Sequence, residues 1–272
     1  MRKMRKLLNF VKKTNHQRPW RIKIVVLVGF SMGVLLSLPS AVPQQEEDKT
    51  TPPVEQVSPK YIYLTFDDGP LRGSQRINDA VRSEKIPITV MLVGAHALVR
   101  PKEVALYKEN EYIEVGNHSY SHANNHYQQY YSHPEGVLLD FKRSMDTLRL
   151  TDKIGRLPGR NMWRIGGRSK NDISSGIEAA DLLHQHGFSL FGWDLEWMHN
   201  PHTAAPIGSA EEIFKQINHL MSEDRVFTTS HLVLLCHDEM FQQAYEETEL
   251  KKLIDLLKTT GNYKFAHLKD YP

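Results

Sequence analysis

The ten residues YIYLTFDDGP, from Tyr61 to Pro70, run from an apolar stretch into two adjacent carboxylates. Alternating apolar side chains predict a β-strand, and the Gly-Pro pair ends it. Successive strand side chains point to opposite faces, so we expect Asp67 and Asp68 to point apart and to take different roles. One acid could bind a metal while the other handles protons. The stretch therefore predicts a chemically active strand end.

A second motif, GNHSYSH, spans Gly116 to His122 and follows another short apolar run. His118 and His122 are four residues apart, which on a helical turn places both imidazoles on one face. Two imidazoles and one carboxylate are a common catalytic zinc set that leaves a fourth position open. The chain has 14 histidines, so the spacing gains its weight from the paired aspartates. Together the two motifs predict a divalent metal site.

These residues resemble the polysaccharide deacetylase family, the carbohydrate esterases with the NodB homology domain. TFDDGP is similar to the family's first motif and HSYSH to its second, and the resemblance covers roughly residues 60–272. It implies a distorted (β/α)7 barrel. It also implies that Asp67 is the general base, and that Asp68, His118 and His122 bind a divalent metal, with Zn²⁺ favoured.

The segment from Arg156 to Arg160 (RLPGR) is similar to the third motif, in which an arginine steadies the base and an aromatic residue follows the proline. Gly159 stands in place of that aromatic residue, which puts the implied sugar contact in doubt, although its backbone N–H could assist the reaction. Arg160 and Arg164 are alternatives to Arg156 as the partner of Asp67.

The segment GWDLEW, from Gly192 to Trp197, resembles the fourth motif, in which an Asp-Trp pair is expected. Glu196 occupies the position before Trp197, and Asp194 is the other candidate for orienting a catalytic histidine. Trp193 and Trp197 are candidate substrate contacts, and core packing explains them equally well.

The segment LVLLCHD, from Leu232 to Asp238, resembles the fifth motif and implies that His237 is the general acid. A side chain that titrates near neutrality suits that role. Tyr120, inside the second motif, is a further candidate substrate contact. The aromatic side chains that follow it, Tyr127, Tyr130 and Tyr131, either stack on sugar rings or pack on the barrel. Two later histidines, His199 and His202, are expected to be exposed.

Apolar runs and amphipathic patterns alternate after residue 60. Strands are expected near 61–66, 87–93, 112–115, 154–157, 188–193, 232–237 and 263–267. Alternating strands and helices imply a parallel sheet, most simply closed into a barrel. The candidate site residues lie at or just after the C-terminal ends of these strands, where barrel enzymes carry their active sites.

The N-terminus has a different character. Residues 1–23 contain nine Lys or Arg and no acid, and residues 24–42 are 19 uncharged residues. This pattern predicts a signal-anchor with a cytoplasmic N-terminus and a periplasmic or extracellular catalytic domain. A cleaved signal peptide is the alternative. Residues 43–59 are expected to form a disordered stalk.

The net charge of +2 combines two unlike parts. Residues 1–23 carry nine basic and no acidic residues, whereas the remainder carries 25 basic and 32 acidic residues, a net charge of −7. This balance argues against a nucleic-acid partner. The single cysteine, Cys236, excludes an intrachain disulfide and is expected to be a buried small hydrophobic residue.

The predicted reaction is metal-dependent removal of N-acetyl groups from an N-acetylglucosamine-type polysaccharide: peptidoglycan, a chitin-like chain or an exopolysaccharide. An O-acetyl esterase or a cyclic-amide hydrolase on the same scaffold is one alternative. A membrane-tethered, sugar-binding pseudoenzyme is another.

Overall fold

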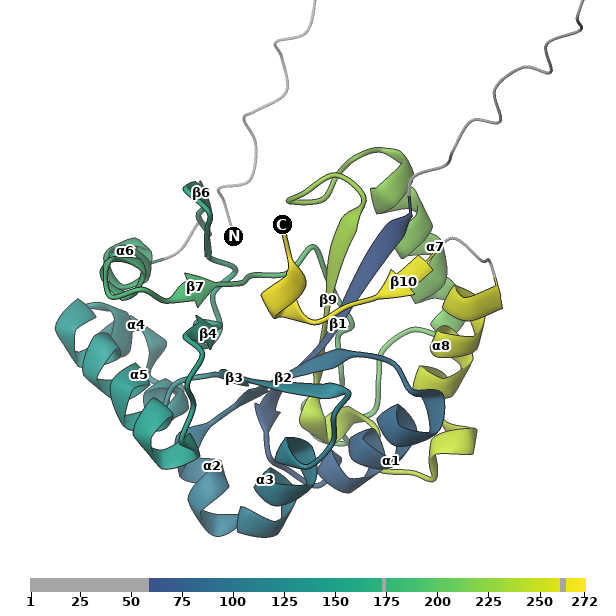
Figure 1. The fold of residues 1–272 in the computed structure, drawn as a ribbon, viewed down its shortest axis with the longest axis horizontal. Helices are drawn as coiled ribbons and strands as arrows, with labels where there is room; N and C mark the ends of the chain where they lie inside the picture. The colour runs from purple at the N-terminus through teal and green to yellow at the C-terminus, as the bar shows by residue number, and fades with distance from the viewer. Residues whose placement is uncertain (1–58, 173–174, 260–262) are drawn as a thin grey trace, which may run out of the picture. The chain divides into compact units, whose positions relative to one another are not determined.

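The computed structural model describes residues 59–172, 175–259 and 263–272. In this part of the chain ten strands form one sheet around which the helices are arranged (Figure 1). The strands are β1 Lys60–Gly69, β2 Ile88–Leu92, β3 Ile113–Asn117, β4 Ile154–Gly155, β5 Trp163–Ile165, β6 Arg168–Lys170, β7 Ser189–Leu190, β8 Leu195–Glu196, β9 His231–His237 and β10 Tyr263–Phe265. Each of the seven predicted strands is present.

The sheet order is β6-β5-β7-β4-β3-β2-β1-β9-β8, and β10 pairs with β1. Every neighbouring pair in this order is parallel from β7–β4 through to β9–β8. Strand β1 also pairs in parallel with β10. The hydrogen-bonded order ends at β6 and β8, so the sheet is a half-barrel rather than the closed barrel that the sequence predicts. The antiparallel hairpin β5–β6 causes the difference, because β5 occupies the free edge of β7.

Eight α-helices connect the described strands. They are α1 Ser74–Glu84, α2 Gly94–Val99, α3 Pro101–Lys108, α4 Tyr127–Tyr131, α5 Pro134–Leu148, α6 Ile177–Gln185, α7 Ala210–Ser222 and α8 Glu249–Thr259. Apolar residues spaced three and four apart along α5 and α8 form a buried stripe on each helix. Amphipathic helices of this kind are stabilised mainly by burying one face against the sheet.

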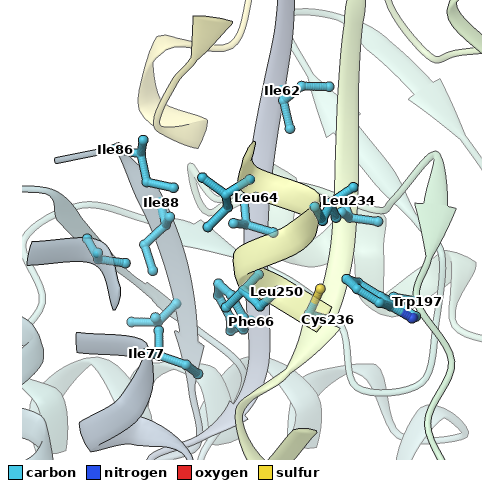
Figure 2. Close-up of a cluster of buried hydrophobic side chains, with 14 of the residues drawn as sticks. Ile62, Leu64, Phe66, Ile77, Ile86, Ile88, Trp197, Leu234, Cys236 and Leu250 are labelled. Carbon is cyan, nitrogen blue, oxygen red and sulfur yellow. The ribbon is translucent and has the colours of Figure 1, made fainter. Parts of the chain in front are cut away.

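The alternation of side chains along β1 and β9 builds the core. Ile62, Leu64 and Phe66 of β1 belong to one buried cluster with Leu234 and Cys236 of β9 (Figure 2). Tyr63 of β1 and Val233 of β9 belong to a different buried cluster, so these two strands carry apolar side chains on both faces. Cys236 is fully buried, as predicted.

Among the described residues no helix is long and apolar enough to cross a membrane. The predicted basic tail 1–23 and signal-anchor 24–42 lie outside the described residues, as does the stalk 43–59 except for Pro59.

Candidate active site

A cavity of about 250 Å³ opens at the C-terminal end of β1. Strands β1, β3, β8 and β9, or the loops that follow them, supply its polar walls, as expected for a sheet of parallel strands. It is lined by Asp67, Asp68, His118, His122, Tyr127, Gly159, Trp193, Glu196, Leu235 and His237. Eight of these ten lining residues have polar or aromatic side chains, so the cavity suits a polar substrate.

The two aspartates point into the same cavity, contrary to the alternation expected from the strand. Oδ2 of Asp67 lies 3.6 Å and Oδ1 of Asp68 lies 3.4 Å from Nε2 of His118. Asp68 has a left-handed backbone (φ 70°), and the pairing of β1 with β2 is irregular between Phe66 and Gly69. This local departure from the extended conformation turns the second carboxylate back to the side of the first.

The two histidines are brought together by an irregular loop, and not by the helical turn that their spacing suggests. Ser119 and His122 both have left-handed backbones, with φ of 64° and 50°. The Ser119 hydroxyl accepts a hydrogen bond from the His122 N–H. Asp140 of α5 accepts from the backbone N–H groups of Tyr120 and Ser121, which ties the loop to the helix. Asp140 is a supporting residue that no sequence motif indicates.

Asp68, His118 and His122 form a group whose ligand atoms all lie within 4.8 Å of one another. Nδ1 of His118 lies 2.9 Å from the Arg156 carbonyl, which can only accept, so this nitrogen carries the proton. Nε2 is therefore the nitrogen of His118 that faces the carboxylates and that can coordinate a metal. Oδ1 of Asp68 lies 3.4 Å from Nε2 of His118 and 3.0 Å from Nε2 of His122. A nitrogen lone pair and a carboxylate oxygen repel each other when nothing lies between them, whereas a cation between them attracts both. The donor set of Asp68, His118 and His122 therefore fits a divalent metal.

The electrostatics of this group also favour a cation. Burial raises the pKa of Asp68, but His118 and His122 outweigh burial and hold it well below its usual value. Burial lowers the pKa of His118, but Asp67 and Asp68 outweigh that effect and raise it. Asp68 is therefore ionised at neutral pH, as a metal ligand must be.

Arg156 is the arginine that contacts Asp67. Its Nη1 donates to Oδ1 of Asp67 at 2.7 Å, and the guanidinium is fully buried. The two alternatives have other partners, because Arg160 donates to Ser175 and Arg164 pairs with Asp181. The pair leaves Oδ2 of Asp67 free to face the cavity.

The structure separates the two acids proposed to orient His237. Asp194 accepts hydrogen bonds from the backbone N–H groups of Phe227 (2.7 Å) and Val233 (2.9 Å) and does not line the cavity. Glu196 lines the cavity with His237. Burial raises the pKa of Glu196, and the nearby His237 partly opposes this rise. Of the two acids, Glu196 is therefore the one that shares the cavity with His237.

His199 contacts His237, although the sequence suggests only an exposed histidine. The two ring centroids are 4.6 Å apart, and Nε2 of His199 lies 3.4 Å from Oε1 of Glu239. Nδ1 of His237 is buried and makes no hydrogen bond with the described residues. Packing against His199 therefore restrains the His237 ring, whose Nδ1 is not held by a hydrogen bond within the part of the chain that the structure describes.

Two predicted substrate contacts line the cavity and two do not. Gly159 and Trp193 are lining residues. Trp197 is fully buried and packs edge-on against Phe241 at 5.6 Å, within the core cluster drawn in Figure 2. Its prediction as a substrate contact is wrong, because the strand alternation of β8 turns it to the helix side.

Tyr120 is the fourth predicted substrate contact. Its ring lies under the guanidinium of Arg143, 3.5 Å from the centroid, and it does not line the cavity. The aromatic stretch after the second motif contributes Tyr127 instead, whereas Tyr131 is buried in a core cluster that Tyr130 packs against. Tyr131 therefore packs on the barrel, whereas Tyr127 faces the cavity.

Comparisons with known proteins agree with this geometry. The family model described as polysaccharide deacetylase matches residues 55–180. YheN of Bacillus subtilis, by its name a candidate polysaccharide deacetylase, is 23% identical over 221 residues, which are 79% of this chain and 70% of that protein.

Two solved structures show the same fold. A family 4 carbohydrate esterase from Streptomyces lividans is 19% identical, and the match covers 77% of this chain and 93% of that one with a TM-score of 0.55. The catalytic domain of a peptidoglycan N-acetylglucosamine deacetylase from Eubacterium rectale is 22% identical, with 78% and 90% covered and a TM-score of 0.56. The polysaccharide deacetylase model thus matches the part of the chain that carries the first three motifs, and the structure gathers residues of those motifs in one cavity, so the chain resembles this family in both sequence and site.

Proposed function

We propose that this deacetylase removes N-acetyl groups from an N-acetylglucosamine-type polysaccharide, such as peptidoglycan, a chitin-like chain or an exopolysaccharide. Asp68, His118 and His122 would hold a divalent cation, and Zn²⁺ is the metal that most often takes two imidazoles and one carboxylate in a catalytic site. When bound, the cation would supply Lewis-acid polarisation of the acetyl carbonyl and make water more acidic.

Asp67 is the proposed general base. Arg156 holds Oδ1, so Oδ2 is the oxygen that faces the cavity and takes the proton of the attacking water. The water oxygen forms a bond to the acetyl carbon, and the carbon–nitrogen bond then breaks. Arg156 fixes the direction of the carboxylate and places a positive charge beside it.

His237 is the proposed general acid. It pairs in register with Asp67 on the neighbouring strand, so base and acid stand side by side at the cavity. An amine leaves poorly as an anion, and a proton from His237 would allow it to leave as the neutral amine. The Glu196 carboxylate lines the same cavity as His237.

The observation that carries the proposal is the convergence of the Asp68, His118 and His122 donors with the Asp67–Arg156 pair in one cavity. The test is acetate release from N-acetylglucosamine oligomers by the purified full-length chain, stripped of metal and then supplied with Zn²⁺. Asp67→Asn is the matched blank, and it should lose about 10²–10⁴-fold in rate with its metal content intact.

The other outcomes each select an alternative. Retained zinc without acetate release would favour an O-acetyl or cyclic-amide substrate, as would a His237→Ala variant that keeps full activity, because an alcohol leaves without a strong acid. Absence of both zinc binding and acetate release would favour a sugar-binding protein that lacks enzymatic activity.

We also propose that the enzyme is anchored in the membrane by residues 24–42, with a cytoplasmic N-terminus and the catalytic domain outside. The support is the basic flank of nine Lys or Arg followed by 19 uncharged residues. A protease-protection assay on intact cells tests it, since an outward domain would be digested from outside.

A further inference from the structure

Tyr127 is the first residue of α4 and lines the cavity, where it and Trp193 are the lining residues with phenol or indole rings. Its ring stands edge-on to the imidazole of His122, with centroids 5.9 Å apart. The side chain is half-buried. Among the described residues none hydrogen-bonds its hydroxyl, so one edge of the ring and a polar tip remain available to a ligand.

Gly159 provides the space that Tyr127 occupies. A methyl group added at Gly159 would lie 3.1 Å from Cε1 and 3.4 Å from Cζ of Tyr127, closer than ordinary contact. The backbone of Gly159 is also left-handed, with φ of 61°, which side chains disfavour. The absence of a side chain at Gly159 therefore makes room for the ring of Tyr127.

The position of α4 is set by the residues that follow Tyr127. The Tyr131 hydroxyl donates to the carbonyl of Pro158 at 2.6 Å, and the Tyr130 hydroxyl donates to Asp140 at 3.0 Å. The Arg160 guanidinium lies over the ring of Tyr131, 4.7 Å from its centroid. These contacts tie the helix to the loop that carries Gly159, so the ring of Tyr127 is held in place before any substrate arrives.

We propose that Tyr127, whose ring lies against Gly159, is a specificity-determining residue that contacts the pyranose ring of the substrate. This inference rests on the proposed function. The C–H face of a pyranose is apolar and its hydroxyl groups are polar, which matches an aromatic ring with a polar tip. A contact of this kind acts equally on bound substrate and transition state, so it contributes to KM more than to kcat.

The test compares two substrates in the zinc-loaded, full-length enzyme: an N-acetylglucosamine oligomer and an aryl acetate that has no sugar. Tyr127→Ala should lower kcat/KM for the oligomer about tenfold more than for the aryl acetate, chiefly through KM. Tyr127→Phe should recover most of the loss. Gln128→Ala, at an exposed position of the same helix, should leave both activities unchanged.

A second variant examines the glycine. Gly159→Ala should lower activity on the oligomer in the wild-type background and have a smaller effect in the Tyr127→Ala background, because no ring is then displaced. Equal losses on both substrates, or loss of bound zinc from Tyr127→Ala, would overturn the inference and make Tyr127 a support for His122. Failure of the wild type to release acetate from the oligomer would instead refute the proposed function.

Discussion

Replacing Arg156 by methionine is expected to destabilise the domain strongly. The guanidinium is fully buried and donates to Oδ1 of Asp67 at 2.7 Å and to the Thr65 hydroxyl at 2.9 Å. It also donates to the carbonyls of Phe191 at 3.0 Å and Gly192 at 2.9 Å. Methionine matches the apolar stem and removes every donor, so one buried charge and three buried neutral acceptors lose their partner.

The size of the effect follows from these contacts. Removing one partner of a buried ion pair costs about 3–5 kcal/mol, because the other charge stays buried. A neutral acceptor left without a donor costs about 1–3 kcal/mol, but water entering the vacated space would satisfy some of the three. The ion pair alone therefore sets a lower limit of about 3 kcal/mol. For a domain of roughly 210 residues this corresponds to a fall in Tm of at least about 6–12 °C.

The measurement is urea unfolding of the full-length chain, followed by far-ultraviolet circular dichroism. Arg82→Met, at an exposed position, is the control and should change the free energy of unfolding by less than about 0.5 kcal/mol. The double variant Asp67→Asn/Arg156→Met removes the stranded charge and should be less destabilised than the sum of the two single variants by about 1 kcal/mol or more. Strict additivity, or an Arg156→Met protein as stable as wild type, would refute the buried ion pair.

Three further predictions concern metal, pH and thiol chemistry. Asp68→Asn should lose bound divalent metal by elemental analysis, whereas Asp67→Asn should retain it, and the opposite pattern would exchange their roles. Burial raises the pKa of Asp194 from 3.8 to about 6. The folded state therefore binds this proton more tightly than the unfolded state, and the resulting stability is complete below about pH 3.8 and is lost as the pH rises through 6. Relative to Asp194→Asn, the wild type should lose about 3 kcal/mol of unfolding free energy between pH 3.5 and pH 7 in urea titrations, and a constant difference would contradict this. Cys236 is fully buried, and burial raises the pKa of its thiol, so it should react with a thiol reagent only in denaturant, and fast labelling of the native protein would place it elsewhere.

Much of the site follows from local sequence patterns. An apolar run that ends in two acids predicts a strand with carboxylates at its tip, and β1 and Asp67 fulfil this because both strand formation and termination depend on neighbouring residues. The same holds for β9 and His237. Parallel strands place such tips at one end of a sheet, so the location of the cavity was predictable as well.

The directions of individual side chains were not predictable in this way. Strand alternation would turn Asp68 away from Asp67, and a helical turn would align His118 with His122. In the structure, residues with left-handed backbones in both segments bring these side chains together instead. Those conformations are uncommon for residues other than glycine, so no propensity rule anticipates them. They persist here because hydrogen bonds from distant parts of the chain, such as those to Asp140, hold the loop.

The sequence by itself determined the strand order along the chain, the family resemblance and the set of residues able to bind a metal or move protons. Only the tertiary structure decided which candidates reach the site. Arg156, and neither of the two other arginines, contacts Asp67. Glu196 and Tyr127 line the cavity, whereas Asp194, Tyr120 and Trp197 do not. The physical reason is that chemical capacity is a property of each side chain, whereas its neighbours and its burial depend on contacts between residues far apart in the sequence. Such contacts form only when the sheet is assembled, and a local pattern carries no record of them.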